Sequence, residues 1–180
     1  MADAAPATTQ LVCLGLNYRT TPVEVRERVA FPETTVPQAV QEVRQLPGFE
    51  EGVVLSTCNR VELYATHTHG KAHEAHETLV KYLVDRFELA PEQAEALVTY
   101  KLDAAEAARH LFRVVSGLDS MVLGETEIFG QVKAAYQTAL ASGTTSRALN
   151  KLFQQAFSVG KKVRNETTIQ RGSTSVGSVA

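Results

Sequence analysis

Two apolar runs separated by a short polar segment stand out in the first half of the chain. Val53 to Leu55 leads into the polar segment Ser56 to Arg60, and the next run, Val61 to Tyr64, alternates apolar and polar residues. An unbroken apolar run predicts a buried strand, whereas alternation predicts a half-buried one, because successive side chains of a strand point to opposite faces. The polar segment is therefore predicted to lie at the rim of a sheet.

The same reading predicts further elements along the chain. Apolar runs over 11–16 and 97–102 indicate two more strands. Helices are predicted over 23–31, 37–46, 74–87 and 104–115, with a helical turn over 91–96. Asp103 is expected to cap the helix 104–115. In the helix 74–87, one apolar stripe is formed by Ala75, Leu79, Leu83 and Phe87.

Two later helices show the same periodicity. The first follows the segment 116–127 and has an inner stripe formed by Ile128, Val132, Ala135 and Ala139. The second begins at Ser146 and is the longest, with an apolar side formed by Leu149, Leu152, Phe153, Ala156, Gly160 and Val163. Residues 172–180 show no helical pattern. The sequence thus predicts a sheet with helices, followed by a long helix.

Composition narrows the class of protein. The chain has 180 residues, of which 44% are hydrophobic and 21% charged, which suits one folded core with an appendage. A net charge of -2 gives no indication of a general polyanion binder, so any contact with nucleic acid would have to come from a local patch. No run is long enough to span a membrane, no import signal opens the chain, and the two cysteines lack zinc-ligand spacing. We expect a cytoplasmic protein with free thiols, no metal and no membrane contact.

The thiol of Cys58 is the first candidate for chemistry. It lies close to Arg60 in sequence, and a nearby cation stabilises the thiolate, which is the nucleophilic form of cysteine. The alternative is that Cys58 is a small core residue, that Asn59 serves a turn and that Arg60 is a surface charge. Cys13 has no charged neighbour in its apolar run, so core packing is its expected role.

Other polar groups also leave two interpretations open. His110 falls at the edge of the apolar arc of its helix, where an imidazole is either structural or a titratable group in a cleft. Acidic residues at 125 and 127 complement a helix dipole, whereas Glu127 and Gln131, which share one face, would line a polar pocket. The histidines within 67–76 suggest a metal site, but their loose spacing and the lack of a carboxylate or thiol that completes the set favour a solvated loop leading into a helix. Either the helix dipole or phosphate contact explains Lys161, Lys162, Arg164 and Arg171.

Several motifs resemble glutamyl-tRNA reductase, the enzyme that opens the C5 route to tetrapyrroles. The motifs are Leu14 to Val23, Leu55 to Tyr64, Ser116 to Glu125, Gln131 to Tyr136 and Val159 to Thr167. They stand in family order and cover nearly the whole chain, so the resemblance is specific. It implies an α+β fold with a ferredoxin-like antiparallel sheet and helices, followed by a long C-terminal helix, and the predicted element order is compatible with that fold.

The resemblance also implies the chemistry. Cys58 matches the nucleophile that attacks the ester between glutamate and tRNA, and NADPH then reduces the resulting thioester to glutamate-1-semialdehyde. His110 matches a histidine needed for activity, which we expect to be an acid/base or orienting group near the leaving ribose hydroxyl. Arg60 suits a clamp on a carboxylate. The family's substrate-contacting positions match Thr57, Asn59, Arg60, Ser120, Glu125, Thr126, Glu127 and Gln131.

One departure concerns Thr126-Glu127, which stands where many family members have Pro-Gln. The carboxylate of Glu127 either adds charge for the substrate ammonium or does not touch substrate. The resemblance divides the chain into a catalytic domain at 1–145 and, at 146–180, a linker (spinal) helix with the start of the NADPH domain. No Gly-x-Gly-x-x-Gly follows a strand, so NADPH is expected to bind in a domain outside this chain.

These expectations define what the chain should do by itself. We expect it to form the thioester, or to hydrolyse the ester slowly, without reducing it. The family context implies glutamyl-tRNA as substrate, and glutamate-1-semialdehyde aminomutase and a homodimer as partners of the full-length enzyme. The alternative function is a non-catalytic module that binds tRNA or a partner protein, and the late basic cluster would support it.

Overall fold

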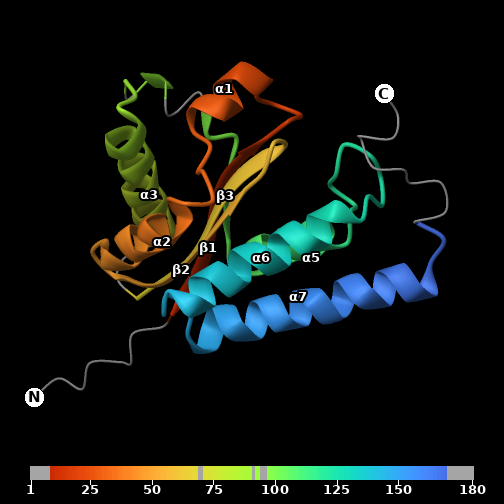
Figure 1. Ribbon diagram of the computed structural model, residues 1–180. Coiled ribbons are helices and arrows are strands. Elements are labelled where there is room, and N and C mark those ends of the chain that lie inside the picture. Colours follow the sequence, from red (N-terminus) through yellow and green to blue (C-terminus); the bar gives the residue numbers. More distant parts are fainter. Residues whose placement is uncertain (1–8, 69–70, 91, 94–96, 170–180) are drawn as a thin grey trace, which may run out of the picture.

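The computed structural model describes residues 9–68, 71–90, 92–93 and 97–169 (Figure 1). Its sheet has four strands in the order β2-β3-β1-β4, and every neighbouring pair is antiparallel. The strands are β1 (Gln10–Asn17), β2 (Phe49–Ser56), β3 (Arg60–His67) and β4 (Tyr100–Asp103). β3 pairs with β2 on one side and with β1 on the other, so the two central strands are β3 and β1. This antiparallel order confirms the predicted ferredoxin-like sheet.

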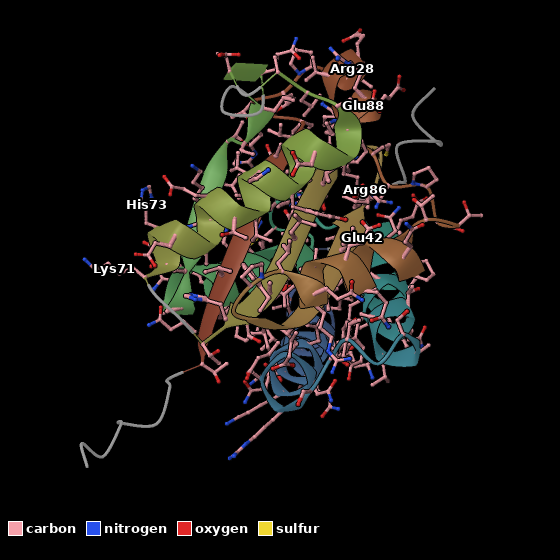
Figure 2. All side chains as sticks on the ribbon, turned by 90° about the vertical axis from the view of Figure 1, so that its left-hand side faces the viewer. Arg28, Glu42, Lys71, His73, Arg86 and Glu88 are labelled. Carbon is pink, nitrogen blue, oxygen red and sulfur yellow. The ribbon has the colours of Figure 1, made fainter. Side chains whose placement is uncertain are left out.

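One face of the sheet is covered by α2 (Val36–Gln45) and α3 (Ala72–Phe87), and the short α1 (Val23–Arg28) lies near one end of the strands (Figure 1). The stripe predicted for α3 is confirmed, since Ala75, Leu79 and Leu83 are buried and Phe87 is half-buried. Figure 2 shows α3 in front of the sheet beside α2, where Arg86 pairs with Glu42. These two helices are thus tied to each other as well as to the sheet.

The opposite face is covered by α5 (Ala104–Val115), α6 (Glu127–Ala141) and α7 (Arg147–Glu166), with α6 and α7 side by side (Figure 1). Phe153 of α7 is fully buried, with its ring 5.7 Å from that of Tyr64 on β3 and 5.4 Å from that of Tyr136 on α6. The long helix therefore shares its core with the sheet. The division of the chain at 145/146 stays a prediction.

The start of α7 is fixed by a carboxylate from the sheet. Glu51 of β2 is buried, and its two oxygens accept hydrogen bonds from the amides of Ser146 (2.6 Å), Ala148 (3.2 Å) and Leu149 (2.9 Å). The first amides of a helix have no partner within the helix, so this carboxylate satisfies donors that burial would otherwise leave unpaired. Ser146 itself makes no side-chain cap.

Three sequence predictions need correction. β3 is buried over its whole length rather than half-buried, because it lies between β1 and β2 and helices cover both faces. Asp103 stands at the N-cap position of α5 but makes no side-chain cap hydrogen bond. The helix predicted over 23–31 ends at Arg28, after which Val29 and Phe31 turn into the core.

Other predicted elements begin or end a few residues away from their observed bounds, or lie outside the described residues. The strand predicted over 97–102 is β4, which starts later, at Tyr100. The predicted helical turn at 91–96 lies largely outside the described residues, as do residues 172–180 entirely. Within the described part of the chain, no helix has the length and apolarity needed to cross a bilayer.

Candidate active site

Cys58 stands at the tip of the tight hairpin between β2 and β3, and it is exposed. The hairpin closes when the amide of Thr57 donates to the carbonyl of Arg60 at 2.8 Å. The hydroxyl of Thr57 accepts from the amides of Asn59 (3.1 Å) and Arg60 (3.2 Å). Thr57, which the sequence predicted to contact substrate, therefore also builds the turn that presents the thiol.

The backbone of this turn is held by residues from the start of the chain. Arg26 of α1 is buried, and its Nε donates to the carbonyl of Cys58 at 3.0 Å. The amide of Tyr18 donates to the carbonyl of Asn59 at 2.9 Å. With both carbonyls of the turn engaged, the position of the Cys58 Cα is fixed while its side chain remains free to react.

A cavity of about 170 Å³ opens beside the thiol. Its walls come from the β2–β3 hairpin, the α5–α6 loop and the first turns of α6, which are far apart in sequence. The lining residues are Thr57, Cys58, Asn59, Arg60, Ser120, Met121, Glu125, Glu127, Ile128 and Gln131. The structure thus brings the predicted nucleophile together with every predicted substrate-contacting residue except Thr126.

The α5–α6 loop depends on a glycine to reach the cavity. Gly117 has φ +72°, and a Cβ there would lie 3.0 Å from the Cα of Gly124, so a larger residue would open the loop. The amide of Gly124 donates to the carbonyl of Gly117 at 2.9 Å. The carbonyl of Ser120 accepts from the Tyr18 hydroxyl at 3.1 Å, which ties this loop to the segment that supports the hairpin.

Arg60, at the start of β3, also connects the hairpin to the α5–α6 loop. Its side chain is only 1% exposed, and Nη1 donates to Glu62 Oε1 at 2.7 Å. Nη2 donates to the carbonyl of Asp119 at 2.6 Å and to its Oδ2 at 3.3 Å. Burial by itself would lower the pKa of Arg60, but Glu62 raises it above its ordinary value. Because both terminal nitrogens already bind protein oxygens, the predicted clamp on a substrate carboxylate stays a prediction.

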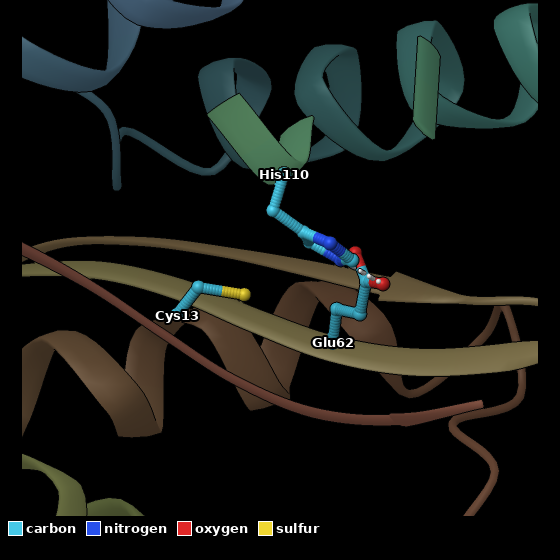
Figure 3. A group of neighbouring side chains, drawn as sticks. All are labelled: Cys13, Glu62 and His110. Carbon is cyan, nitrogen blue, oxygen red and sulfur yellow. Dashed lines mark hydrogen bonds and ion pairs between the residues drawn. The ribbon is translucent and has the colours of Figure 1, made fainter. Parts of the chain in front are cut away.

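Glu62 is fully buried and is the centre of a polar cluster (Figure 3). Its Oε1 accepts from Arg60, from the Tyr100 hydroxyl (2.5 Å) and from His110 Nε2 (2.8 Å), and its Oε2 accepts from the Tyr64 hydroxyl (2.6 Å). Burial alone would raise the pKa of Glu62, but Arg60 and then His110 hold it well below its usual range. An ionised carboxylate only accepts hydrogen bonds, so Nε2 of His110 carries the hydrogen.

A glycine makes room for one of these donors. A Cβ at Gly15 of β1 would lie 2.6 Å from the ring of Tyr100, so only glycine lets that ring lie across the strand. The Tyr100 hydroxyl thereby reaches Glu62. Burial, with Glu62 as the next cause, raises the pKa of Tyr100 far above its ordinary value, which keeps the phenol protonated as a donor.

The cluster does not suit a metal ion. Donor atoms of Cys13, Glu62 and His110 lie within 4.8 Å of one another (Figure 3). Metal binding requires a thiolate, but burial and the neighbouring Glu62 raise the pKa of Cys13 well above its usual value. Both oxygens of Glu62 are already occupied by hydrogen-bond donors. Glu62 and His110 are therefore part of a hydrogen-bonded support behind the cavity.

A family model described as the N-terminal domain of glutamyl-tRNA(Glu) reductase matches residues 14–167. The chain belongs to the glutamyl-tRNA reductase family. The predicted resemblance is confirmed by relatives as well. Glutamyl-tRNA reductase of Akkermansia muciniphila is 52% identical over 174 residues, which is 95% of this chain and 49% of that protein. Glutamyl-tRNA reductase 2 of Koribacter versatilis is 46% identical over 167 residues, covering 93% of this chain and 37% of that protein.

The fold agrees with a solved member of the reductase family. The structure of glutamyl-tRNA reductase from Methanopyrus kandleri superimposes with a TM-score of 0.74 and 35% sequence identity. The match covers 93% of this chain and 37% of that one. The chain thus spans about half or less of the length of the curated relatives and of the solved reductase.

Two of the predicted reductase site residues lie outside the cavity. Thr126 is the N-cap residue of α6, and its carbonyl accepts from Arg164 Nη2 at 3.0 Å. His110 is not among the cavity-lining residues and connects to the cavity through Glu62 and Arg60. Its predicted role near the leaving ribose hydroxyl, as an acid/base or orienting group, therefore stays a prediction, and the hydrogen bond that the structure gives it is to Glu62.

Sequence reasoning missed several residues that support this site. Arg26, Glu62, Tyr100 and Asp119 were not singled out, although each contacts a site residue directly. One signal was present for Glu62, which stands two residues after Arg60 on the same strand face. The other contacts join distant segments, and no pattern within one segment indicates them.

Proposed function

We propose that this chain is the acyl-transfer domain of a glutamyl-tRNA reductase and that Cys58 accepts the glutamyl group. The observation that carries the proposal is an exposed thiol that lines a small cavity whose walls come from three distant segments. A structural cysteine would be expected in the core, as Cys13 is. The family membership supports the choice of glutamyl-tRNA as substrate.

The proposed step is a transesterification. The thiolate sulfur of Cys58 attacks the carbonyl carbon of the ester between glutamate and the terminal ribose of tRNA, and an S–C bond forms. The C–O bond to the ribose then breaks, and the ribose oxygen takes up a proton. The products are a glutamyl thioester on Cys58 and free tRNA, and no electrons have been exchanged.

The charges around the cavity suit the ends of a glutamyl group. Glu125 and Glu127 line it and offer carboxylates to the substrate ammonium. Arg60 is the cationic side chain among the lining residues, so the side-chain carboxylate of the substrate is proposed to lie on its side of the cavity, although Glu62 and Asp119 bind its terminal nitrogens. His110 acts as a positioning residue, because its Nε2–H fixes Glu62, which in turn fixes Arg60.

Reduction of the thioester belongs to the longer enzyme. NADPH would deliver a hydride to the thioester carbonyl, releasing glutamate-1-semialdehyde and the Cys58 thiolate. Binding of NADPH, contact with the partner aminomutase and formation of the homodimer are likewise proposed for the full-length reductase. This chain alone is proposed to stop at the thioester and to lose the glutamyl group slowly to water.

Intact-protein mass spectrometry tests the proposal. The chain is incubated with glutamyl-tRNA, quenched in acid and compared with Cys58→Ser and, as a matched thiol control, Cys13→Ala. We expect one glutamyl adduct on the wild type and on Cys13→Ala, and none on Cys58→Ser. If no adduct forms and the glutamyl-tRNA ester stays intact, the catalytic proposal is wrong.

A non-catalytic tRNA-binding module is the second candidate. Lys161 and Lys162 are exposed on α7, but Lys162 faces Glu166 at 4.0 Å. Arg164 stacks over the Phe129 ring at 4.5 Å and donates to Thr126, so it holds α7 against α6. The described part of the cluster is thus partly used within the protein. Tight tRNA binding without an adduct would favour this second function.

A further inference from the structure

A second cavity continues from the candidate active site along the edge of the sheet. It has a volume of about 530 Å³ and shares Thr57 and Gln131 with the cavity beside Cys58. It runs between α6 and the segment that leads into α2, and we call it the edge groove. Its other lining residues are Phe31, Glu33, Val36, Pro37, Val54, Leu55, Ser56, Ala134, Ala135 and Thr138.

The floor of the edge groove is the outer side of β2, which is an edge strand. Both backbone groups of Gly52 point outward, since its amide donates to the Thr144 carbonyl (2.9 Å) and its carbonyl accepts from the Thr144 hydroxyl (3.0 Å). Antiparallel pairing alternates, so Val54 and Ser56 also point their backbone groups outward. The inward-facing Thr57, bonded to Arg60 across the hairpin, agrees with this alternation.

The outward groups of Ser56 are the accessible ones. Ser56 is half-buried, whereas Val54 is almost fully buried. The Ser56 hydroxyl accepts from the amide of Phe31 at 2.9 Å, but within the described ranges its backbone amide and carbonyl have no partner on the groove side. Ser56 therefore offers one donor and one acceptor, side by side, a single residue away from the cavity beside Cys58.

The remaining walls select against a phosphate. The lining contains one carboxylate, Glu33, and no lysine or arginine. Phe31, Pro37 and the small residues Ala134 and Ala135 provide apolar surfaces. A volume of about 530 Å³ lies within the range of roughly 300–1,000 Å³ typical of small-molecule sites. These features suit a flat, neutral and hydrogen-bonding group, such as a nucleobase with its ribose.

We propose that the edge groove binds the 3′-terminal adenosine of the aminoacylated tRNA. This inference rests on the proposed function, because the ester that Cys58 attacks is carried by the ribose of that adenosine. With the ribose near Thr57 and Gln131, the base extends toward Ser56. Its N1 accepts from the Ser56 amide and its exocyclic amine donates to the Ser56 carbonyl, which is a two-bond readout of adenine.

An added peptide strand is the other occupant that an open sheet edge invites. The open stretch is short, because Thr144 closes the edge at Gly52 and the hairpin ends it after Thr57. Strand addition gains its affinity from a row of main-chain hydrogen bonds, for which this edge offers only two outward-facing residues. The geometry therefore favours a nucleoside.

The test uses the whole 180-residue chain and the trinucleotide CCA without an attached amino acid, so its binding needs no reaction at Cys58. Backbone amide resonances are followed during titration. We expect the amide of Ser56 to shift. A trinucleotide ending in inosine should bind about tenfold or more weakly, because its base presents a donor at N1 and an acceptor at the exocyclic position.

A matched pair of variants locates the site. Ala134→Phe fills the edge groove from an exposed position on α6, and Ala141→Phe makes the same change on the same helix outside the groove. We expect Ala134→Phe to weaken CCA binding about tenfold or more and Ala141→Phe to leave it unchanged. Equal affinity of the two variants, a preference for inosine, or shifts confined to other surfaces would overturn the proposal, as would a peptide that moves Ser56 when CCA does not.

The two proposals fail separately. A glutamyl adduct on Cys58 without CCA binding in the edge groove leaves the acyl transfer standing and removes this site. CCA binding in the groove without an adduct keeps the adenosine site and removes the chemistry.

Discussion

Cys58 and Cys13 carry the same thiol in opposite surroundings. Cys58 is exposed on a hairpin, whereas Cys13 is buried in β1 and burial raises its pKa. Because only an accessible thiolate reacts, we expect iodoacetamide to modify Cys58 at neutral pH and to leave Cys13 intact until the protein unfolds. Peptide mass mapping before and after denaturation measures this. Equal labelling of both cysteines in the folded protein would contradict the assignment of Cys58 as the reactive thiol.

The candidate nucleophile Cys58 could be picked out from sequence, whereas the residues that support its hairpin could not. Cys58, Asn59 and Arg60 stand together in one polar segment, so a local pattern reveals them. The sequence suggested that Arg60 was either a surface charge or a ligand clamp, and the structure shows it buried between Glu62 and Asp119. The nearby Glu62 gave one signal, but local sequence cannot show that Asp119, 59 residues away, also binds the buried guanidinium.

The helices and strands themselves were predicted better than the contacts that their polar side chains make with other elements. The periodicity of α3 and α7 identified most of their buried residues, because a helix facing a sheet needs one apolar stripe. Phe87, Leu152 and Val163 are only half-buried, and the buried His76 and Tyr82 were not predicted. The alternation in β3 was misread as one face in water. Its polar positions Arg60 and Glu62 instead face a second layer of helices and pair with each other. The periodicity of a strand shows which positions are polar, but it does not show which polar side chains are buried with an ion-pair or hydrogen-bond partner.

The carboxylate of Glu51 gives a prediction about α7. Replacing it in Glu51→Gln removes a charged acceptor from three amides, so we expect the free energy of unfolding to fall by about 1–2 kcal/mol. Glu50→Gln is the matched control, since the neighbouring Glu50 is exposed and loses the same charge. Urea unfolding monitored by circular dichroism gives both values. Equal effects of the two substitutions would show that Glu51 does not cap the helix.

Taken together, the sheet and its two helical layers form one connected core, in which Phe153 is the largest apolar contribution of α7. Truncation in Phe153→Ala should lower the free energy of unfolding by about 3–5 kcal/mol and leave a single transition. Leu152→Ala, at a half-buried position of the same helix, should cost less. Circular dichroism in the far and near ultraviolet follows both transitions. A variant that loses only α7 while the sheet persists would contradict a shared core.

The polar cluster around Glu62 makes the stability of the molecule depend on pH. The pKa of Glu62 is lower in the folded protein, so its stabilising contribution is complete at neutral pH and declines as the pH falls below about 4. Tyr64 and Tyr100 have raised pKa values, mainly through burial, so their contribution is complete at neutral pH and declines as the pH rises above about 10. We therefore expect maximal stability between these limits.

The variant Glu62→Gln separates this cluster from the remaining carboxylates. It removes the closer of the two carboxylates that pair with the buried Arg60 and leaves Asp119 at 3.3 Å. At neutral pH we therefore expect a loss of about 3 kcal/mol, the lower end of the range for breaking a buried ion pair. The difference from wild type should shrink as the pH falls from about 5 toward 2.5, because Glu62 of the unfolded wild type takes up a proton over this range whereas the folded carboxylate stays ionised. Urea unfolding at several pH values measures the difference, with Glu50→Gln as the control. A difference that stays constant with pH would mean that Glu62 does not carry the acid dependence of folding.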